Sequence, residues 1–146
     1  MRNHGLQTFF LRLGLAASLL SAVADRFGLW GPYGKLGVAW GDMTHFMLYV
    51  GKLNPWFPNA TIPAVGWAVT VIEIALGALL LIGFQTRRAA LLSGWLLLSF
   101  AIAMTINTGA KGPLDYSVFA ASGGAFLLAT VRHYRWSIDE AREPKD

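Results

Sequence analysis

Four long apolar runs, separated by polar or glycine-rich segments, set the pattern of this chain. They cover residues 6–24, 62–83, 89–106 and 116–131. About 20 helical residues are long enough to cross the roughly 30 Å hydrocarbon core of a bilayer. The pattern therefore predicts an all-α protein, a four-helix transmembrane bundle that forms a single membrane domain over residues 1–146.

The first run also has features of a secretory signal peptide. Arg2 precedes it, and Ala22-Val23-Ala24 resembles a cleavage site. Arg12, however, interrupts the apolar part, where a signal peptide is uniformly hydrophobic. We therefore expect this run to be retained as a membrane span.

The connection over residues 25–61 is long and rich in glycine and proline. Within it, Asp42 is placed to cap a helix over residues 43–53, whose apolar and polar side chains fall on different faces. We expect this short amphipathic helix to lie on the membrane surface in the first extracytoplasmic loop. The tryptophans and tyrosines around it favour an aromatic belt at the headgroup level, and the alternative is that they line the mouth of a ligand site.

The remaining connections are short. Residues 84–88 predict a tight reversal, and Asp115 is a candidate N-cap for the fourth span. The tail, residues 132–146, is charged, and beyond Trp136 we expect it to be loosely helical or disordered.

The charge distribution predicts the orientation in the membrane. Eight of the 12 Lys and Arg residues fall with the termini and the 84–88 turn, and four fall in the other two loops. Cytoplasmic loops carry the excess of basic residues, so both termini are predicted to be cytoplasmic. We expect a multi-pass protein of the bacterial cytoplasmic (inner) membrane.

Composition narrows the function classes further. The chain is 55% hydrophobic and 14% charged, and its net charge is +4. Its basic residues lie between apolar runs and form no stripe with stacking aromatics, so nucleic acid is not an expected partner. The chain has no cysteine, which excludes disulfides, thiolate catalysis and cysteine-ligated metal clusters.

Glu73, about halfway along the second run, is the main chemical anomaly. A charged residue at the centre of a membrane helix costs roughly 2.5 to 3.5 kcal/mol, so a carboxylate there needs a proton, a cation or a polar cavity. Arg12 lies at a depth that differs from that of Glu73 by about 6 Å, which an arginine side chain can bridge. One hypothesis is an Arg12–Glu73 pair. The alternative is that Arg12 extends to the headgroups while a protonated Glu73 bonds to Thr70, Gln85 or the backbone.

Glu73 is the candidate catalytic residue, and the candidate ligand-binding set consists of Arg12, Glu73, Thr70, His45 and Trp40. The three histidines are predicted to lie at helix ends or in the outer loop, so no facing pair is available for a haem, and no metal site is predicted.

Three segments carry a family likeness. They are FFLRLGLAASLLSAVADRFG, VIEIALGALLLIGFQTRRAALLSG and LDYSVFAASGGAFLLA, and together they resemble the DoxX family of small integral membrane proteins. The residues that match its pattern are Arg12, Glu73, Gly83, Thr86 and Arg87. The resemblance implies a four-helix membrane bundle and an association with quinone-linked oxidoreductase systems.

Three functions fit these observations. The first is a DoxX-like membrane protein that binds a hydrophobic ligand or a membrane or extracytoplasmic protein partner, without catalysis of its own or an intrinsic cofactor. The second is a quinone-interacting subunit of a membrane oxidoreductase system, with Glu73 and Arg12 at the site and Glu73 exchanging a proton with the quinone. The third is a small transporter or proton channel that works as a homo-oligomer.

Overall fold

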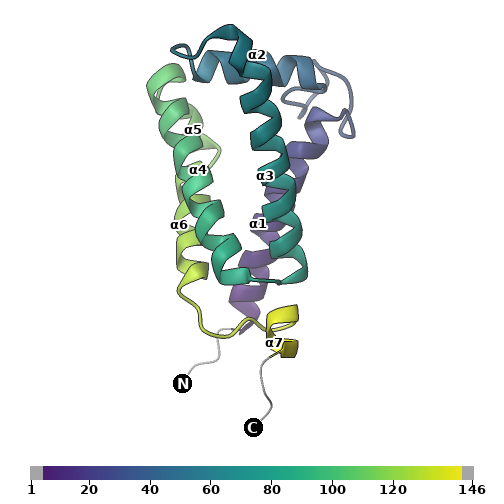
Figure 1. Ribbon diagram of the computed structural model, residues 1–146, viewed down its shortest axis with the longest axis vertical. Helices are drawn as coiled ribbons and strands as arrows, with labels where there is room; N and C mark the ends of the chain where they lie inside the picture. Colours follow the sequence, from purple (N-terminus) through teal and green to yellow (C-terminus); the bar gives the residue numbers. More distant parts are fainter. Residues whose placement is uncertain (1–4, 143–146) are drawn as a thin grey trace.

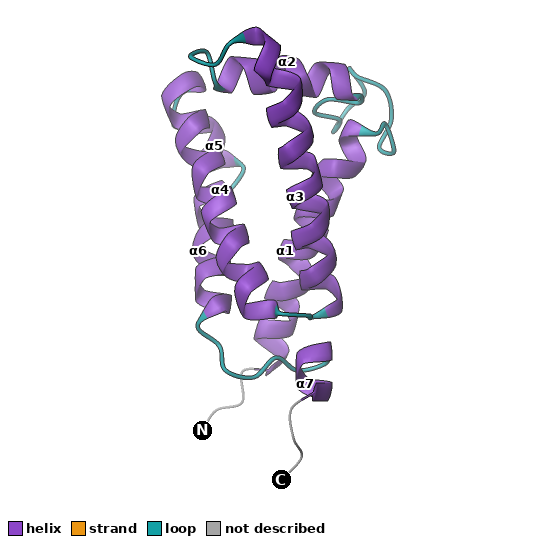
Figure 2. Ribbon diagram, viewed as in Figure 1, coloured by secondary structure: helices purple, strands orange, loops and turns teal. Residues whose placement is uncertain are grey.

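The computed structural model describes residues 5–142, and these residues contain helices and no strand. The helices are α1 (Gly5–Arg26), α2 (Met43–Leu53), α3 (Ile62–Ile82), α4 (Thr86–Thr108), α5 (Lys111–Asp115), α6 (Val118–Ala129) and α7 (Ile138–Arg142), with a 3₁₀ turn η1 (Asn59–Thr61) before α3. The predicted all-α class is confirmed (Figure 2).

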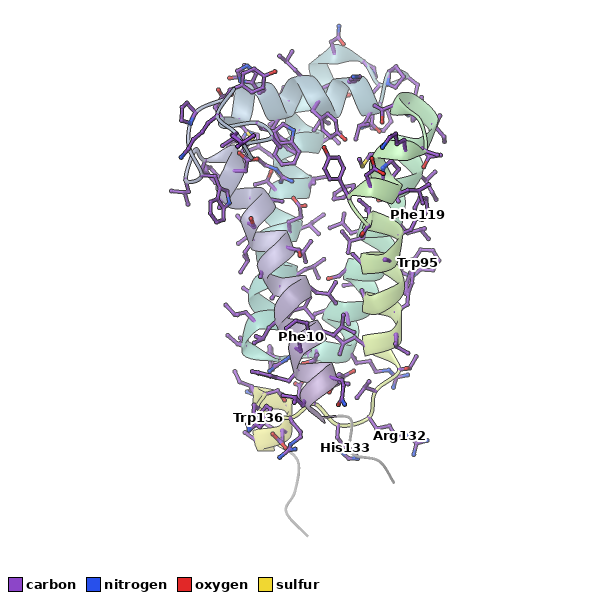
Figure 3. All side chains as sticks on the ribbon, turned by 180° about the vertical axis from the view of Figure 1, so that it is seen from behind. Phe10, Trp95, Phe119, Arg132, His133 and Trp136 are labelled. Carbon is purple, nitrogen blue, oxygen red and sulfur yellow. The ribbon has the colours of Figure 1, made fainter. Side chains whose placement is uncertain are left out.

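Three of the helical segments are long and apolar enough to cross a membrane. They are α1, the segment Asn59–Ile82 that contains α3, and α4. The helix α6 is apolar but has only 12 residues. Large apolar side chains also cover the outside of the molecule, among them Phe10, Trp95 and Phe119 (Figure 3). These features are those of a multi-pass protein in a lipid bilayer.

The long helices pack in two pairs, which run side by side along the length of the molecule. The helix α1 packs mainly against α3, and α4 mainly against α6, with further contacts between α3 and α4 and between α1 and α6 (Figure 1). The α4–α6 packing is close enough for the Ser122 hydroxyl to donate to the Gly94 carbonyl at 2.8 Å. At one end α2 lies across the helices, and at the other end lies α7. We call these the α2 end and the α7 end.

Of the two predicted helix caps, Asp42 is confirmed and Asp115 is wrong. Asp42 caps α2, because its carboxylate accepts a hydrogen bond from the His45 amide at 2.8 Å. Asp115, in contrast, does not cap the fourth apolar helix. It ends the short helix α5, pairs with Lys111, and is followed by Ser117 in the left-handed conformation before α6 begins.

The C-terminal segment contains a short helix that is bonded to the turn between α3 and α4. Beyond Trp136, residues 138–142 form α7, and the Asp139 amide donates to the Gly83 carbonyl at 3.0 Å. Of the two alternatives predicted for the tail beyond Trp136, the helical one therefore holds for residues 138–142 and the disordered one does not, and residues 143–146 lie outside the described part of the chain. The physical reason is that the turn between α3 and α4 offers backbone groups that this segment can bond.

The two helices α1 and α3 are offset along their axes. Arg26, the last residue of α1, contacts Thr70 and Glu73 in the middle of α3. Arg12 lies so close to Gly83, just after α3, that a Cβ atom on Gly83 would overlap its guanidinium. Since Thr70 is eight residues into α3, that helix extends roughly 12 Å beyond the end of α1 towards the α2 end. This offset decides which charged side chains meet.

Candidate functional site

The buried charge of Glu73 is paired with Arg26. The two side chains form an ion pair through Arg26 Nη1 and Glu73 Oε2, and each residue is only 2% exposed. Arg26 Nη1 also donates to Thr70 Oγ1 at 2.9 Å, and the Thr70 hydroxyl donates to the Gly66 carbonyl at 2.8 Å. Thr70 and Glu73 are three residues apart and so share a face of α3. This face presents both a carboxylate and a hydroxyl to one guanidinium.

Two aromatic rings cover the Arg26 guanidinium. Its central carbon lies 3.7 Å from the centroid of the Phe46 ring and 5.3 Å from that of Trp40. The two rings meet edge to face, with centroids 5.1 Å apart and planes at 76°. A cation over an aromatic face is attracted by the negative ring potential, more strongly when water is excluded. We call Arg26, Glu73, Thr70, Trp40 and Phe46 the Arg26 cluster.

Asp25 holds one of these rings in place. Its carboxylate accepts hydrogen bonds from the backbone amides of Ala39 at 2.8 Å, Trp40 at 3.3 Å and Gly41 at 3.0 Å. Gly41 has φ +71°, and a Cβ atom there would overlap the backbone at Tyr33. The loop therefore folds tightly onto the end of α1. The neighbouring residues Asp25 and Arg26 thus fasten the loop and α3, respectively, to the same helix end.

The Arg26 cluster is closed. Glu73 Oε2 meets Arg26 as an ion pair without an aligned hydrogen bond, and Arg26 Nε has no hydrogen-bond partner among the described residues. Two surface hollows lie elsewhere. One is between α1 and α6, and the other is between α2 and the start of α3, lined by Thr44, Met47, Leu48, Gly51, Asn59, Ile62 and Pro63. The pair is thus placed to join helices, and the second hollow lies beside it, because Met47 of its lining follows Phe46 of the cluster.

The hypothesis of an Arg12–Glu73 pair is wrong. Arg12 is buried at the α7 end, where its Nη2 donates to the Trp136 carbonyl at 2.7 Å. The prediction assumed that the ends of α1 and α3 are level, whereas the offset between them brings Arg12 to the end of α3. The alternative, in which Arg12 extends to the headgroups, is also wrong, because the Arg12 side chain is buried and only 1% exposed.

The other candidate residues separate into two groups. Thr70 and Trp40 lie with Glu73 in the Arg26 cluster. His45 does not: its ring stacks on Tyr33 with centroids 3.8 Å apart, and its Nδ1 lies 2.8 Å from the nearer Asp42 oxygen. The His45 amide, followed by the His45 side chain, holds the pKa of Asp42 below its ordinary value. His45 therefore belongs to the cap of α2.

Sequence reasoning missed Asp25, Arg26 and Phe46 as members of this region. Asp25 and Arg26 follow the end of the first apolar run, a position typical of solvated loop ends, yet they are 6% and 2% exposed. One signal was available, because Thr70 and Glu73 form a polar pair on one face of an otherwise apolar helix and so call for a donor. The identity of that donor depended on the helix offset.

Metal binding has no support in the described part of the chain, where no three His, Asp or Glu side chains come together as a metal site would need. Comparison of the chain with family models, with curated proteins and with solved structures gave no match.

Proposed function

We propose that this chain is a DoxX-like membrane protein that binds a hydrophobic ligand or partner at the α2 end, without catalysis of its own. In this proposal α1, α3, α4 and α6 form a four-helix transmembrane bundle, α2 lies on the extracytoplasmic surface, and the α7 end is cytoplasmic. The resemblance of three segments to the DoxX family supports the bundle. The eight-to-four distribution of basic residues supports the orientation.

The single observation that carries the proposal is the contrast between the closed Arg26 cluster and the open groove beside it. Glu73 has its cation within the protein, and aromatic rings cover that cation, so Glu73 is occupied as a structural group. Breaking such a buried pair costs about 3–5 kcal/mol, which is a reason to keep it intact during function. A ligand therefore has better access to the groove between α2 and α3.

The groove suits an apolar chain with a polar end. Leu48 is 68% exposed at its edge, and Met47 lies on Gly66 so closely that a Cβ atom on Gly66 would overlap its sulfur. Methionine is flexible and polarizable, and it adapts to apolar ligands of varied shape. Thr44 and Asn59 add polar groups to the same lining. An acyl or isoprenoid chain with a small head group is the class of ligand that fits.

The experiment is a count of bound lipid in the purified protein. We expect native mass spectrometry from detergent to detect a retained lipid on the wild type and its loss in Leu48→Trp, which fills the groove. Leu114→Trp is the matched control, because Leu114 is similarly exposed at 62% but lies in α5. Equal lipid retention in all three proteins would contradict a ligand site in this groove.

A quinone-interacting role is the second candidate, and the position of Phe46 favours it. Phe46 covers Arg26, and its neighbour Met47 lines the groove, so a quinone in the groove would be one α2 residue from the charged cluster. Reduction of such a quinone by its oxidoreductase partner would take up two electrons and two protons, and Glu73 would relay one of these protons after a local movement of Phe46. If quinone reduction in a reconstituted membrane is unchanged in Glu73→Gln, Glu73 has no part in it.

A further inference from the structure

At the α7 end, the beginning of α4 holds a carboxylate from the C-terminal segment. Asp139 accepts hydrogen bonds from the Gln85 amide at 2.8 Å through Oδ1 and from the Thr86 amide at 2.7 Å through Oδ2. The first amides of a helix have no partner within it, and they carry the positive end of the helix dipole. Two of them converging on one anionic group is the arrangement by which helix N-termini bind phosphate. Here a side chain of the same chain occupies it.

Two buried polar side chains beside Asp139 have unused hydrogen-bonding capacity. Thr86 is fully buried, and its hydroxyl has no partner among the described residues. Arg12 is 1% exposed, and its Nε and Nη1 are likewise without partners there. Nη1 lies against Gly83, whose carbonyl accepts from the Asp139 amide.

The number of donors around Asp139 exceeds what its carboxylate accepts, which points to an anion with more oxygens. Each oxygen of Asp139 accepts from one backbone amide, and neither is within hydrogen-bond reach of the Thr86 hydroxyl or of Arg12 Nε and Nη1. Leaving buried donors unpaired costs about 1–3 kcal/mol per group. A phosphate group has further oxygens in tetrahedral directions and a larger charge, and it would accept from the hydroxyl and from the guanidinium as well as from the amides.

The segment that supplies Asp139 is lightly held. The helix α7 has five residues, none of them buried, and a helix that short has little stability of its own. Its other ties include the bond from Arg12 Nη2 to the Trp136 carbonyl at 2.7 Å, the Trp136 amide to Glu140 at 2.6 Å, the edge-to-face contact of Trp136 with Phe9, and Arg142 over Phe84. Trp136 lies at this end of the molecule with Arg132 and His133 (Figure 3). If α3 spans the bilayer, its end at Gly83 lies at the depth of the lipid phosphates.

We propose that the N-terminus of α4, together with Thr86 and Arg12, is a phosphate-binding site that Asp139 fills as a tethered substitute. A phosphate with unesterified oxygens, from a lipid headgroup or from solution, displaces Asp139 and releases α7. This site lies at the opposite end of the molecule from the ligand groove. The proposal is therefore independent of the proposed function.

The test uses the absence of cysteine from the chain. A single Ala141→Cys substitution places one spin label on the exposed side of α7, in protein purified in a phosphate-free maltoside detergent. We expect inorganic phosphate, at constant ionic strength set with chloride, or phosphatidic acid in mixed micelles, to increase the mobile fraction of the label. In Asp139→Asn we expect the label to be mobile before any phosphate is added. The phosphate probe should then raise the Tm of this variant, at a concentration at least tenfold lower than the concentration that releases α7 in the wild type.

Thr86→Val removes the unpaired hydroxyl without changing the shape of the side chain and should weaken the phosphate response about tenfold. Thr105→Val is the matched control, since Thr105 lies in α4 and donates only to the Ala101 carbonyl of its own helix. A response to inorganic phosphate identifies a soluble anion as sufficient, and a response to phosphatidic acid alone, with none to phosphatidylcholine, identifies a lipid headgroup.

The proposal is overturned if neither probe mobilises the label in the wild type, or if Thr86→Val responds like Thr105→Val. Asp139 is then only a cap for α4. The label mobility in the wild type and the comparison of Thr86→Val with Thr105→Val both use proteins that keep Asp139. These two results therefore remain valid even if Asp139→Asn does not fold.

Discussion

Arg26, the last residue of α1, forms a buried ion pair with Glu73 in the middle of α3. The pair is possible because α3 extends beyond α1 at the α2 end, so that the space above Arg26 is filled by α2 and by the loop that Asp25 fastens. The Glu73 carboxylate at the centre of α3 thereby meets the Arg26 guanidinium at the end of α1. Arg26 joins three elements: α1 by its backbone, α3 by its charge, and α2 by the Phe46 ring.

Asp25 is expected to control the order of the loop. In Asp25→Ala three backbone amides lose a charged acceptor, and hydrogen bonds to charged groups contribute about 1.5–3 kcal/mol each. We expect the protein to lose about 2–4 kcal/mol of unfolding free energy and trypsin to cleave after Lys35 at least tenfold faster. Asp115→Ala is the control, because Asp115 pairs only at the exposed surface of α5. Equal cleavage rates in the two variants would show that Asp25 does not anchor the loop.

The close packing of α4 on α6 gives a second prediction. A Cβ atom on Gly94 would lie 2.7 Å from the ring of Phe126, whereas a Cβ atom on Gly123 would meet nothing within 4 Å. Gly94→Ala should therefore destabilise the protein by about 1–3 kcal/mol through overpacking. Gly123→Ala, in the same helix pair, should stabilise it by up to about 1 kcal/mol because alanine is the better helix former. Thermal unfolding in detergent compares them, and equal effects would contradict the packing described.

The cap of α2 predicts a contribution to stability that depends on pH. The pKa of Asp42 is lowered in the folded protein, chiefly by the His45 amide. A group with a lowered folded pKa stabilises the fold above its unfolded value, about 3.9 for aspartate, and that contribution is lost as the pH falls through the folded pKa. Asp42→Asn keeps a good cap that does not titrate. Its Tm should fall less than that of the wild type on acidification below about pH 4.

If Tm falls equally on acidification in the wild type and in Asp42→Asn, Asp42 does not contribute to the pH dependence of stability. Asp42→Ala serves as the control for capping itself, because it lacks the acceptor at every pH. It should have a lower Tm than both proteins at neutral pH.

The predictable part of this protein is the part determined locally. Apolar runs define the long helices, and the helix after Asp42 follows from one capping residue and the pattern of the 11 residues after it. The boundaries of α1, α3 and α4 lie within a few residues of the predicted spans. The start of α6 was less predictable, because the turn at Tyr116 and Ser117 depends on a left-handed residue that is not glycine.

The partner of Glu73 was not predictable in the same way. Choosing between Arg12 and Arg26 requires the axial offset of α1 against α3, and that offset results from packing between segments distant in sequence. Leu20 and Ala16 of α1 contact Gly77 of α3, for example, and this close approach helps to set the register of the two helices. The order of α7 is non-local for the same reason, since Asp139 finds its donors at Gln85 and Thr86.

The central claim is that Arg26, and not Arg12, is the partner of Glu73, and a double-mutant cycle in equilibrium unfolding tests it most directly. We expect Glu73→Gln alone to cost about 3–5 kcal/mol, because it leaves Arg26 buried without its counter-ion. The cycle of Arg26→Gln with Glu73→Gln should give a coupling free energy of at least about 1.5 kcal/mol, and the cycle of Arg12→Gln with Glu73→Gln should be additive within about 0.5 kcal/mol. Additivity with Arg26, or a larger coupling with Arg12, would contradict the account.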